Sequence, residues 1–233
     1  MYTAAVIVAG GLGVRMGNAV PKQFLPLGGK PVLMRTLEPF IACPRIEEII
    51  VAVPRENITE AERLTAALAS GKPVRVVPGG AERQDSVFQG LSALRPECGV
   101  VVIHDAVRPF ITAHLIAECI EAAERFGAVT VARRITETVK AVENGVVVET
   151  LDRSKLWITQ TPQAFCAGII RRAHEEARRD RFLGTDDCML VERLGQPVHV
   201  IEGNDTNIKI TVPGDMAVAG AILKLYERGE NGC

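Results

Sequence analysis

The sequence predicts an α/β fold in which helices flank a mainly parallel sheet. Short β-branched runs alternate with longer amphipathic runs, and this order favours parallel strands joined by right-handed crossovers. The short runs are apolar throughout, which is typical of strands buried on both faces. With 233 residues and 47% hydrophobic content, the chain can bury a full core. We therefore expect one domain that covers residues 1–233.

Residues 1–132 contain five strand-like runs and three helix-like runs in alternation. The predicted strands are Ala4–Val8, Ile49–Val53, Val74–Val77, Val100–His104 and Val129–Ala132. The predicted helices, with apolar residues at helical spacing, are Glu60–Ala69, Asp85–Leu94 and His114–Phe126. In sheets of this kind ligands bind at the carboxyl ends of the strands, so we expect the functional site there.

One segment departs from this alternation. Two β runs, Glu137–Val142 and Val146–Leu151, flank the dipeptide Asn144-Gly145, which favours a tight hairpin turn. We expect this hairpin, over about residues 136–156, to project from the body as an arm.

Beyond the arm, the pattern predicts three helices and one strand. They are the helix Gly168–Arg179, the helix Asp186–Leu194 with Thr185 as its N-cap, the strand Val198–Ile201 and the helix Asp215–Arg228. No repeat, low-complexity tract or interdomain linker interrupts this order.

Composition excludes several classes of protein. The net charge is -1, from 27 basic and 28 acidic residues, so no overall field would gather nucleic acid or an anionic membrane. No apolar run approaches the ~20 residues that span a bilayer, and Met1–Thr3 leads into a strand rather than a signal peptide. The six cysteines show no C-x-x-C pair and no regular spacing. We expect reduced thiols in a cytoplasmic protein, with no nucleic-acid or membrane partner.

The first predicted strand leads into a glycine-rich loop. In Ala9-Gly10-Gly11-Leu12-Gly13-Val14-Arg15-Met16-Gly17, the glycines let backbone N–H groups approach and cradle phosphate oxygens. No Gly-Lys-Ser/Thr follows, which excludes a Walker A loop, and the glycine spacing misses the dinucleotide fingerprint by one residue. A glycine turn that serves only the fold is the alternative interpretation.

Two cations favour phosphate binding at this loop. Arg15 lies within it, and Lys22 follows in Pro21-Lys22-Gln23-Phe24. Nucleotidyl transfer develops negative charge on the equatorial and leaving oxygens of the α-phosphate, and fixed cations stabilise that transition state. Taken singly, either residue could be ordinary surface charge.

Ala9–Met16 together with Pro21–Phe24 resembles the signature of the 2-C-methyl-D-erythritol 4-phosphate cytidylyltransferase family. Further segments are similar to family motifs and occur in the family's order: Gly79–Val87, His104–Pro109, Asp152–Trp157, Gln160–Gln163, Thr185-Asp186 and Asn207–Thr211. The resemblance covers essentially the whole chain. It implies a Rossmann-like sheet of the nucleotidyltransferase type. It also implies synthesis of 4-diphosphocytidyl-2-C-methyl-D-erythritol and pyrophosphate from CTP and 2-C-methyl-D-erythritol 4-phosphate, a step in non-mevalonate isoprenoid precursor biosynthesis.

The resemblance assigns one set of residues to CTP. Gly80, Ala81 and Ser86 match positions that surround the cytosine, and Ala81 departs from the aspartate of some relatives, which leaves a backbone contact there. Arg83 would hold either this loop or a phosphate. The predicted nucleotide-binding set is Ala9, Gly10, Gly11, Leu12, Gly13, Lys22, Gly80, Ala81, Arg83, Ser86, Asp105 and Ala106.

Asp105 ends a predicted central strand, where its carboxylate could hold Mg²⁺ or another divalent cation between phosphate groups. The alternative for Asp105 is helix capping or a salt bridge. We expect His104 to be a satisfied strand-end residue rather than a ligand. Arg108, three residues after Asp105, lies within reach of a sugar phosphate or hydroxyl.

The resemblance assigns a second set of residues to the sugar phosphate. Arg153 and Lys209 correspond to family residues that position the attacking phosphate, and with Arg15 and Lys22 they form the predicted catalytic set. In the family a similar arm crosses to a partner subunit and completes its site, which implies a homodimer. Thr138 matches the arm position that touches the substrate. The predicted substrate-binding set is Asp105, Arg108, Thr138, Arg153, Thr161, Thr185 and Lys209.

The predicted reaction is an in-line attack of the sugar phosphate on the α-phosphorus of CTP. A ribitol 5-phosphate cytidylyltransferase is the nearest alternative, although Asp152–Trp157 resembles the methylerythritol group more closely. A non-catalytic nucleotide-binding regulator is expected to lack one or more charged positions. All of these are present: Arg15, Lys22, Asp105, Arg153 and Lys209. We also expect no fused second enzyme, because the chain ends one helix after Lys209.

Overall fold

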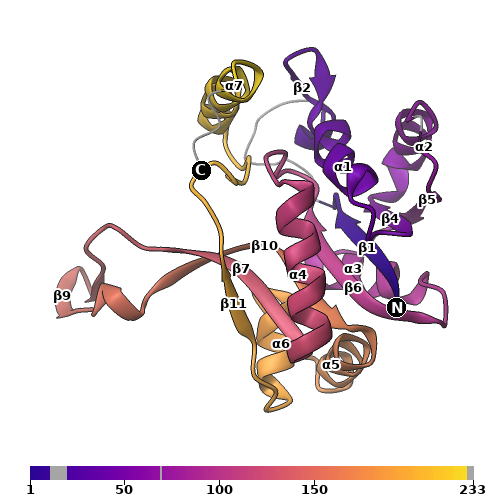
Figure 1. The fold of residues 1–233 in the computed structure, drawn as a ribbon. Helices are drawn as coiled ribbons and strands as arrows, with labels where there is room; N and C mark the ends of the chain where they lie inside the picture. Colours follow the sequence, from indigo (N-terminus) through magenta and orange to yellow (C-terminus); the bar gives the residue numbers. More distant parts are fainter. Residues whose placement is uncertain (11–19, 69, 230–233) are drawn as a thin grey trace.

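The computed structural model describes residues 1–10, 20–68 and 70–229, and its centre is one seven-stranded sheet (Figure 1). The strands of this sheet are β1 (Tyr2–Val8), β4 (Glu48–Val53), β5 (Val74–Pro78), β6 (Cys98–Asp105), β7 (Ala128–Arg134), β10 (Trp157–Cys166) and β11 (His199–Glu202). The helices are α1 (Val32–Ala42), α2 (Ile58–Ala66), α3 (Arg83–Ser92), α4 (Ala113–Phe126), α5 (Ala167–Arg179), α6 (Asp187–Arg193) and α7 (Pro213–Glu227).

The sheet has the strand order β11-β7-β10-β6-β1-β4-β5. All neighbouring strands pair in parallel except β10, which runs antiparallel to both β6 and β7. The chain builds outward from β1 to β4 and β5, and then returns to place β6 on the other side of β1. The predicted mainly parallel α/β fold is therefore confirmed, and the order of its strands reverses between β1 and β6.

Helices cover both faces of the sheet. Successive residues of a strand point to opposite faces, so each central strand contributes to two core layers. Ala5 and Ile7 of β1 pack in the core layer that includes residues of α1, α2 and α4. Ala4 and Val6 of β1 pack in the layer that includes residues of α3, α5 and α6. Both faces of β1 are therefore buried, as its continuous apolar run predicted.

The predicted strands and helices of residues 1–132 all correspond to observed elements, with ends displaced by up to three residues within the described part of the chain. Besides short strands and 3-10 turns, two elements of the structure were not predicted, α1 and β10. The helix α1 contains Pro39, a residue that usually ends helices. The strand β10 contains Pro162, which argues against a central strand. Its pairing with β7 is interrupted between Thr159 and Gln163, so Pro162 lies where no ladder bond to β7 is needed.

Side-chain caps explain where two of the helices, α3 and α6, begin. α3 begins at Arg83 rather than Asp85, because the Asp85 carboxylate accepts a hydrogen bond from the N–H of Glu82 and closes the first turn. The predicted N-cap Thr185 is wrong. Asp186 caps α6, and its Oδ1 accepts from Met189 N at 2.9 Å, since a carboxylate satisfies the free N–H groups of the first turn.

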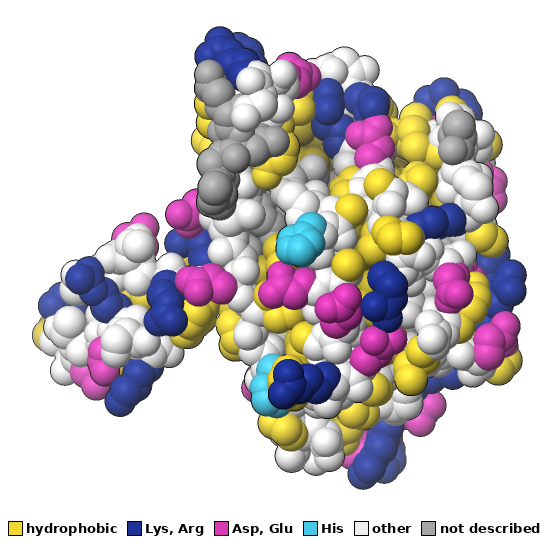
Figure 2. All heavy atoms as spheres, in the orientation of Figure 1, with side chains coloured by type: hydrophobic (Ala, Val, Ile, Leu, Met, Phe, Trp, Pro, Cys, Tyr) yellow, Lys and Arg dark blue, Asp and Glu magenta, His cyan; other side chains and the backbone are white. Residues whose placement is uncertain are grey.

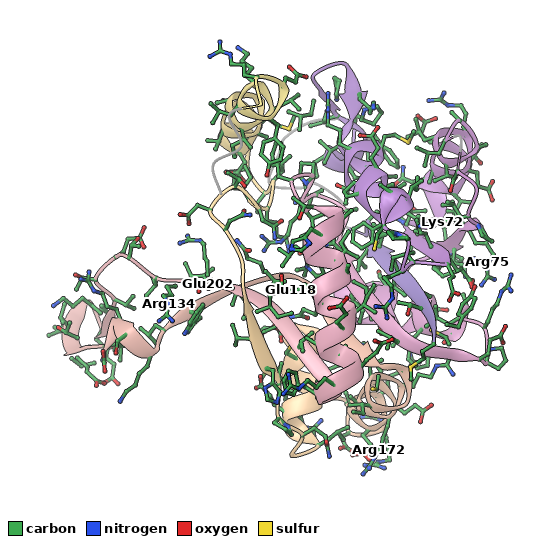
Figure 3. All side chains as sticks on the ribbon, in the orientation of Figure 1. Lys72, Arg75, Glu118, Arg134, Arg172 and Glu202 are labelled. Atoms are coloured by element: carbon green, nitrogen blue, oxygen red, sulfur yellow. The ribbon has the colours of Figure 1, made fainter. Side chains whose placement is uncertain are left out.

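The predicted arm is confirmed as a hairpin of β8 (Lys140–Glu143) and β9 (Val146–Thr150), and Figure 2 shows it standing clear of the body. Its turn holds Asn144 and Gly145 at positive φ, as an Asn-Gly turn requires. At its base, Arg134 lies 3.6 Å from the Glu202 carboxylate of β11 and 4.3 Å from the Trp157 ring centroid (Figure 3). These contacts join the arm to the sheet edge.

A third apolar cluster joins α7 to the segment around residues 207–212. Ile210 is fully buried against Leu223 of α7, Val107 and Leu27. Leu27 belongs to a small hairpin of β2 (Pro26–Leu27) and β3 (Lys30–Pro31), which follows the 3-10 turn η2 (Lys22–Phe24). The cluster therefore fixes the segments that carry Lys22 and Lys209 on the same side of the sheet.

Candidate active site

Two adjoining cavities lie at the carboxyl ends of β1 and β6, where Val8 pairs with Asp105. The first cavity has a volume of about 360 Å³ and is lined by Val8, Ala9, Gly10, Lys22, Gln23, Ala81, Glu82, Arg83, Asp105, Val107, Lys209 and Thr211. The second has a volume of about 220 Å³ and is lined by Arg83, Asp105, Arg108, Thr159, Gln160, Thr161, Gln163, Thr185, Asp186 and Lys209. The two cavities share Arg83, Asp105 and Lys209. They occupy the point where the strand order reverses, which is where open α/β sheets bind ligands.

A larger depression of about 520 Å³ lies over α2 and β5, but its cations are already used in the fold. Lys72 Nζ donates to the carbonyls of Phe40 and Cys43, and Arg75 pairs with the buried carboxylate of Glu48 (Figure 3). We therefore place the site at β1 and β6.

Close packing holds the start of the glycine loop against α3. A Cβ on Gly10 would lie 2.9 Å from Ser86 Oγ, and one on Gly80 would lie 2.2 Å from Asp85 Cβ. Ser86 Oγ in turn accepts from Gly80 N at 3.1 Å. Only glycine allows these approaches, so the backbone itself forms this wall of the first cavity.

Lys22 reaches the first cavity because its neighbour is anchored. Gln23 is buried, and its Nε2 donates to the Ala9 carbonyl at 2.8 Å. This bond ties η2 to the end of β1. Lys22, the first residue of η2, consequently lies in the wall of the first cavity.

Asp105 is the centre of the charge network between the two cavities. Its Oδ1 accepts from Arg83 Nε at 3.0 Å, and its Oδ2 lies 2.8 Å from Lys209 Nζ and 3.7 Å from Arg108 Nε. Burial opposes ionisation of this carboxyl, but Arg83, Lys209 and Arg108 outweigh burial and hold the pKa of Asp105 well below its usual range. Asp105 is therefore ionised at neutral pH and organises three cations.

A polar network behind Asp105 fixes its position. Thr161 Oγ1 accepts from Asp105 N at 3.0 Å and lies 3.0 Å from His104 Nδ1. His104 Nε2 lies 3.1 Å from the carbonyl of Arg108, and the imidazole is fully buried. The prediction that His104 is a satisfied strand-end residue is confirmed. Arg108 Nη1 donates to the Asn207 carbonyl at 2.8 Å, which links the Asp105 strand to the segment of Lys209.

Burial lowers the pKa of His104 to about 4, and this predicts a pH dependence of stability. The unfolded chain binds a proton at this residue below about pH 6.5, whereas the folded chain does so only below about pH 4. The free energy of unfolding should therefore fall as pH falls between these values, by at most about 3 kcal/mol from this residue. Urea unfolding of wild type and His104→Asn across this range measures it. A variant curve with the same slope as wild type would contradict the assignment.

The structure brings most of the predicted site residues together. The first cavity holds Ala9, Gly10, Lys22, Ala81, Arg83, Asp105 and Lys209, and the second holds Arg83, Asp105, Arg108, Thr161, Thr185 and Lys209. Gly80, Ser86 and Ala106 line neither cavity: Ser86 and Ala106 are buried, and Gly80 is exposed and donates to Ser86 Oγ. Thr138 and Arg153 are exposed on the arm and line neither cavity. The predicted residues Gly11, Leu12, Gly13 and Arg15 lie outside the described residues.

Sequence reasoning missed the buried groups that support these side chains. Gln23, Asp187 and Asn207 are buried and bond to a residue or strand of the site, and the buried His174 bonds to Asp187. Gln23 and Asn207 lie inside recognised motifs, and that is the signal that could have identified them. His174 and Asp187 carry no local signal, because their partners are distant in the sequence.

Two cavities with cationic walls, at the strand-order reversal of a doubly wound α/β sheet, define an enzyme that handles phosphate groups. A sequence profile of the 2-C-methyl-D-erythritol 4-phosphate cytidylyltransferase (IspD) family matches residues 3–225. The enzyme of that name from Geobacter metallireducens is 45% identical over 228 residues, and the match covers 96% of this chain and 98% of the relative. The one from Geobacillus kaustophilus is 44% identical over 223 residues, covering 96% and 97%.

Solved structures give the same result. The 4-diphosphocytidyl-2C-methyl-D-erythritol synthase of Anaerococcus prevotii has a TM-score of 0.86 and 32% identity, with 96% of each chain covered. The 2-C-methyl-D-erythritol 4-phosphate cytidylyltransferase of Thermus thermophilus has a TM-score of 0.75 and 34% identity, covering 94% of this chain and 98% of that one. The chain belongs to the 2-C-methyl-D-erythritol 4-phosphate cytidylyltransferase family, and it is a nucleotidyltransferase.

Proposed function

We propose that this chain joins the phosphate of 2-C-methyl-D-erythritol 4-phosphate to CMP from CTP and releases pyrophosphate, in non-mevalonate isoprenoid precursor biosynthesis. The observation that carries the proposal is the pair of cavities that share Arg83, Asp105 and Lys209. The first cavity, which Ala9 and Gly10 line, takes CTP. The second, lined by threonine, glutamine and Arg108, takes the hydroxylated sugar phosphate.

The proposed mechanism needs no general base. A phosphate monoester is a dianion near neutral pH, and its oxygen attacks the α-phosphorus in line while the pyrophosphate oxygen leaves. Lys22 lies in the wall of the first cavity, where an ammonium stabilises charge on the α-phosphate, and Arg15 is proposed for the same task. Lys209 and Arg108 lie at the second cavity and orient the attacking phosphate.

A magnesium ion fits these residues only together with the nucleotide. Among the described residues no group of three or more His, Cys, Asp or Glu side chains forms a metal site. Both oxygens of Asp105 are paired with cations. Mg²⁺ usually takes one or two carboxylates plus substrate phosphates, so Asp105 suits an ion that arrives on CTP. The ion would offset the triphosphate charge and orient the leaving pyrophosphate.

The arm supports a homodimer in which each subunit completes its partner's site. Arg153 and Thr138 are exposed on the arm, and Arg153 Nη1 donates only to the nearby Thr136 carbonyl among the contacts of the described residues. Four valines of β8 and β9 are more than half exposed: Val142, Val146, Val147 and Val148. A second subunit would cover these side chains and place Arg153 beside its second cavity.

A cytoplasmic location is proposed with this function. No helix in the described ranges is long and apolar enough to cross a membrane. The cysteines of those ranges are free thiols, and four of them are buried, namely Cys43, Cys98, Cys119 and Cys188. Reduced cysteines are typical of a reducing compartment.

Pyrophosphate release tests the proposal. With CTP and Mg²⁺, we expect release with methylerythritol 4-phosphate, little release with ribitol 5-phosphate, and little when UTP or ATP replaces CTP. Chelation of the divalent cation with EDTA should stop the reaction, and added Mg²⁺ should restore it. Release only with ribitol 5-phosphate would show that the chain is a ribitol 5-phosphate cytidylyltransferase instead. Release that survives EDTA would remove the metal from the mechanism.

A further inference from the structure

A chain of buried polar groups leads from the helix layer to Asp105. His174 Nε2 of α5 lies 3.0 Å from Asp187 Oδ1 of α6, and Asp187 Oδ2 accepts from Arg83 Nη1 at 2.7 Å. Arg83 Nε, at the start of α3, donates to Asp105 Oδ1 at 3.0 Å. Because a carboxylate only accepts, the His174 ring carries its hydrogen on Nε2. The chain joins three helices to the strand end at the two cavities.

The two outer members of this chain do not touch the cavities. The side chains of His174 and Asp187 are 0% and 1% exposed, and neither residue lines either cavity. Arg83 is the member that reaches both. The Asp187 side chain reaches the cavities through the guanidinium of Arg83. Its backbone N–H also donates to Gln163 Oε1 of the second cavity at 3.2 Å, a bond that a change of the Asp187 side chain leaves available.

Arg83 makes one hydrogen bond to Asp105 rather than two. An arginine facing one carboxylate prefers two parallel hydrogen bonds to it. Here Asp187 takes Nη1 and Asp105 receives only Nε, while Nη2 is buried without a partner among the described residues. The second oxygen of Asp105 lies 2.8 Å from Lys209 Nζ instead. Arg108 Nε lies 3.7 Å from the same oxygen. By holding Nη1, Asp187 fixes the tilt of the Arg83 guanidinium against Asp105.

We infer that Asp187 and His174 are positioning residues, which hold the Arg83 guanidinium to one oxygen of Asp105 and keep the other oxygen for Lys209. His174 orients the Asp187 carboxylate, Asp187 orients Arg83, and Arg83 sets the geometry at the junction of the cavities. The inference rests on the proposed transfer reaction for its kinetic readout, and on CTP binding for an independent one.

The first test compares paired substitutions. Asp187→Asn keeps the shape but removes the charge that holds Arg83, and we expect kcat/KM to fall by about 10- to 100-fold. His174→Leu removes the donor to Asp187 and should lower kcat/KM about tenfold. His174→Gln places an amide N–H near the position of Nε2, so it should stay within about threefold of wild type. Equal activity of the Leu and Gln variants would overturn the role of His174.

The second test separates positioning from stability. In an Arg83→Ala background, Asp187→Asn should cause no further loss of kcat/KM, because its effect passes through the missing guanidinium. Thermal unfolding and circular dichroism check that each variant is folded. A purely structural role predicts independent losses that multiply, with KM unchanged for the folded fraction. That result would overturn the inference. If Asp187→Asn does not fold, the two His174 variants in the Arg83→Ala background replace it.

CTP binding makes the two possible failures distinguishable. Titration calorimetry of CTP against the same variants should show a weaker Kd for Asp187→Asn in the wild-type background and no further change in the Arg83→Ala background. If wild type binds CTP and the variants show this coupling, but neither sugar phosphate is a substrate, the proposed reaction is refuted and the inference stands. If wild type turns over methylerythritol 4-phosphate but the variants show no coupling, the inference is refuted and the proposed reaction stands.

Discussion

Lys22→Ala is expected to lower kcat by about 10²- to 10³-fold and leave the fold intact. Lys22 lies in the wall of the first cavity, and its segment is anchored independently of it by the bond from Gln23 to Ala9. In the proposed mechanism the ammonium stabilises charge that develops on the α-phosphate during transfer, so its loss is expected to act mainly on the transition state. Steady-state pyrophosphate release, with circular dichroism for the fold, measures the effect.

Lys30→Ala is the matched control for this substitution. Lys30 belongs to β3, a few residues along the same segment, and its ammonium pairs with Glu38 on the surface. Exposed pairs of this kind contribute little to stability, so kcat should stay near that of wild type. Near-full activity of Lys22→Ala, or an equal loss in both variants, would remove Lys22 from the catalytic set.

Arg153→Ala is expected to lower kcat/KM by about 10²-fold or more, since its planar fork can grip two oxygens of the attacking phosphate. The residue is exposed on the arm and lines neither cavity of its own chain. The loss should therefore fall on the partner's site. Mixing two inactive variants tests this directly.

Co-expression of Arg153→Ala with Lys22→Ala should restore activity. In a mixed dimer, one site combines an intact body with an intact arm and the other carries both defects. A random mixture should then recover up to about a quarter of wild-type activity, because half of the dimers are mixed and each has one good site. Either variant expressed alone is the control, and sedimentation gives the oligomeric state. A monomer, or a mixture as inactive as its parts, would show that the arm does not act in the partner's site.

Much of this architecture follows from local sequence signals. The continuous apolar runs predicted β1, β4 and β6, and the Asn144-Gly145 turn predicted the arm. Asp105 was predicted at the end of a central strand from the polar residue that follows such a run, and the structure confirms its place. These features are local, because a strand buried on both faces and a tight hairpin turn each restrict the residues that form them.

Other features have no such signal. The strand β10 contains Pro162 and polar side chains, and only its neighbours β6 and β7 make it a strand. The interruption of its pairing at Thr159–Gln163 opens the second cavity, which Thr161 lines.

The sequence by itself determined that the chain is an α/β nucleotidyltransferase with a glycine loop, a strand-end aspartate and an arm. Only the tertiary structure decided which charges meet. Arg83 and Asp187 are 104 positions apart, and the fold brings them to 2.7 Å. The buried Asp187 carboxylate would be costly without a charged partner, and its burial is a property of the packed layers rather than of any short segment.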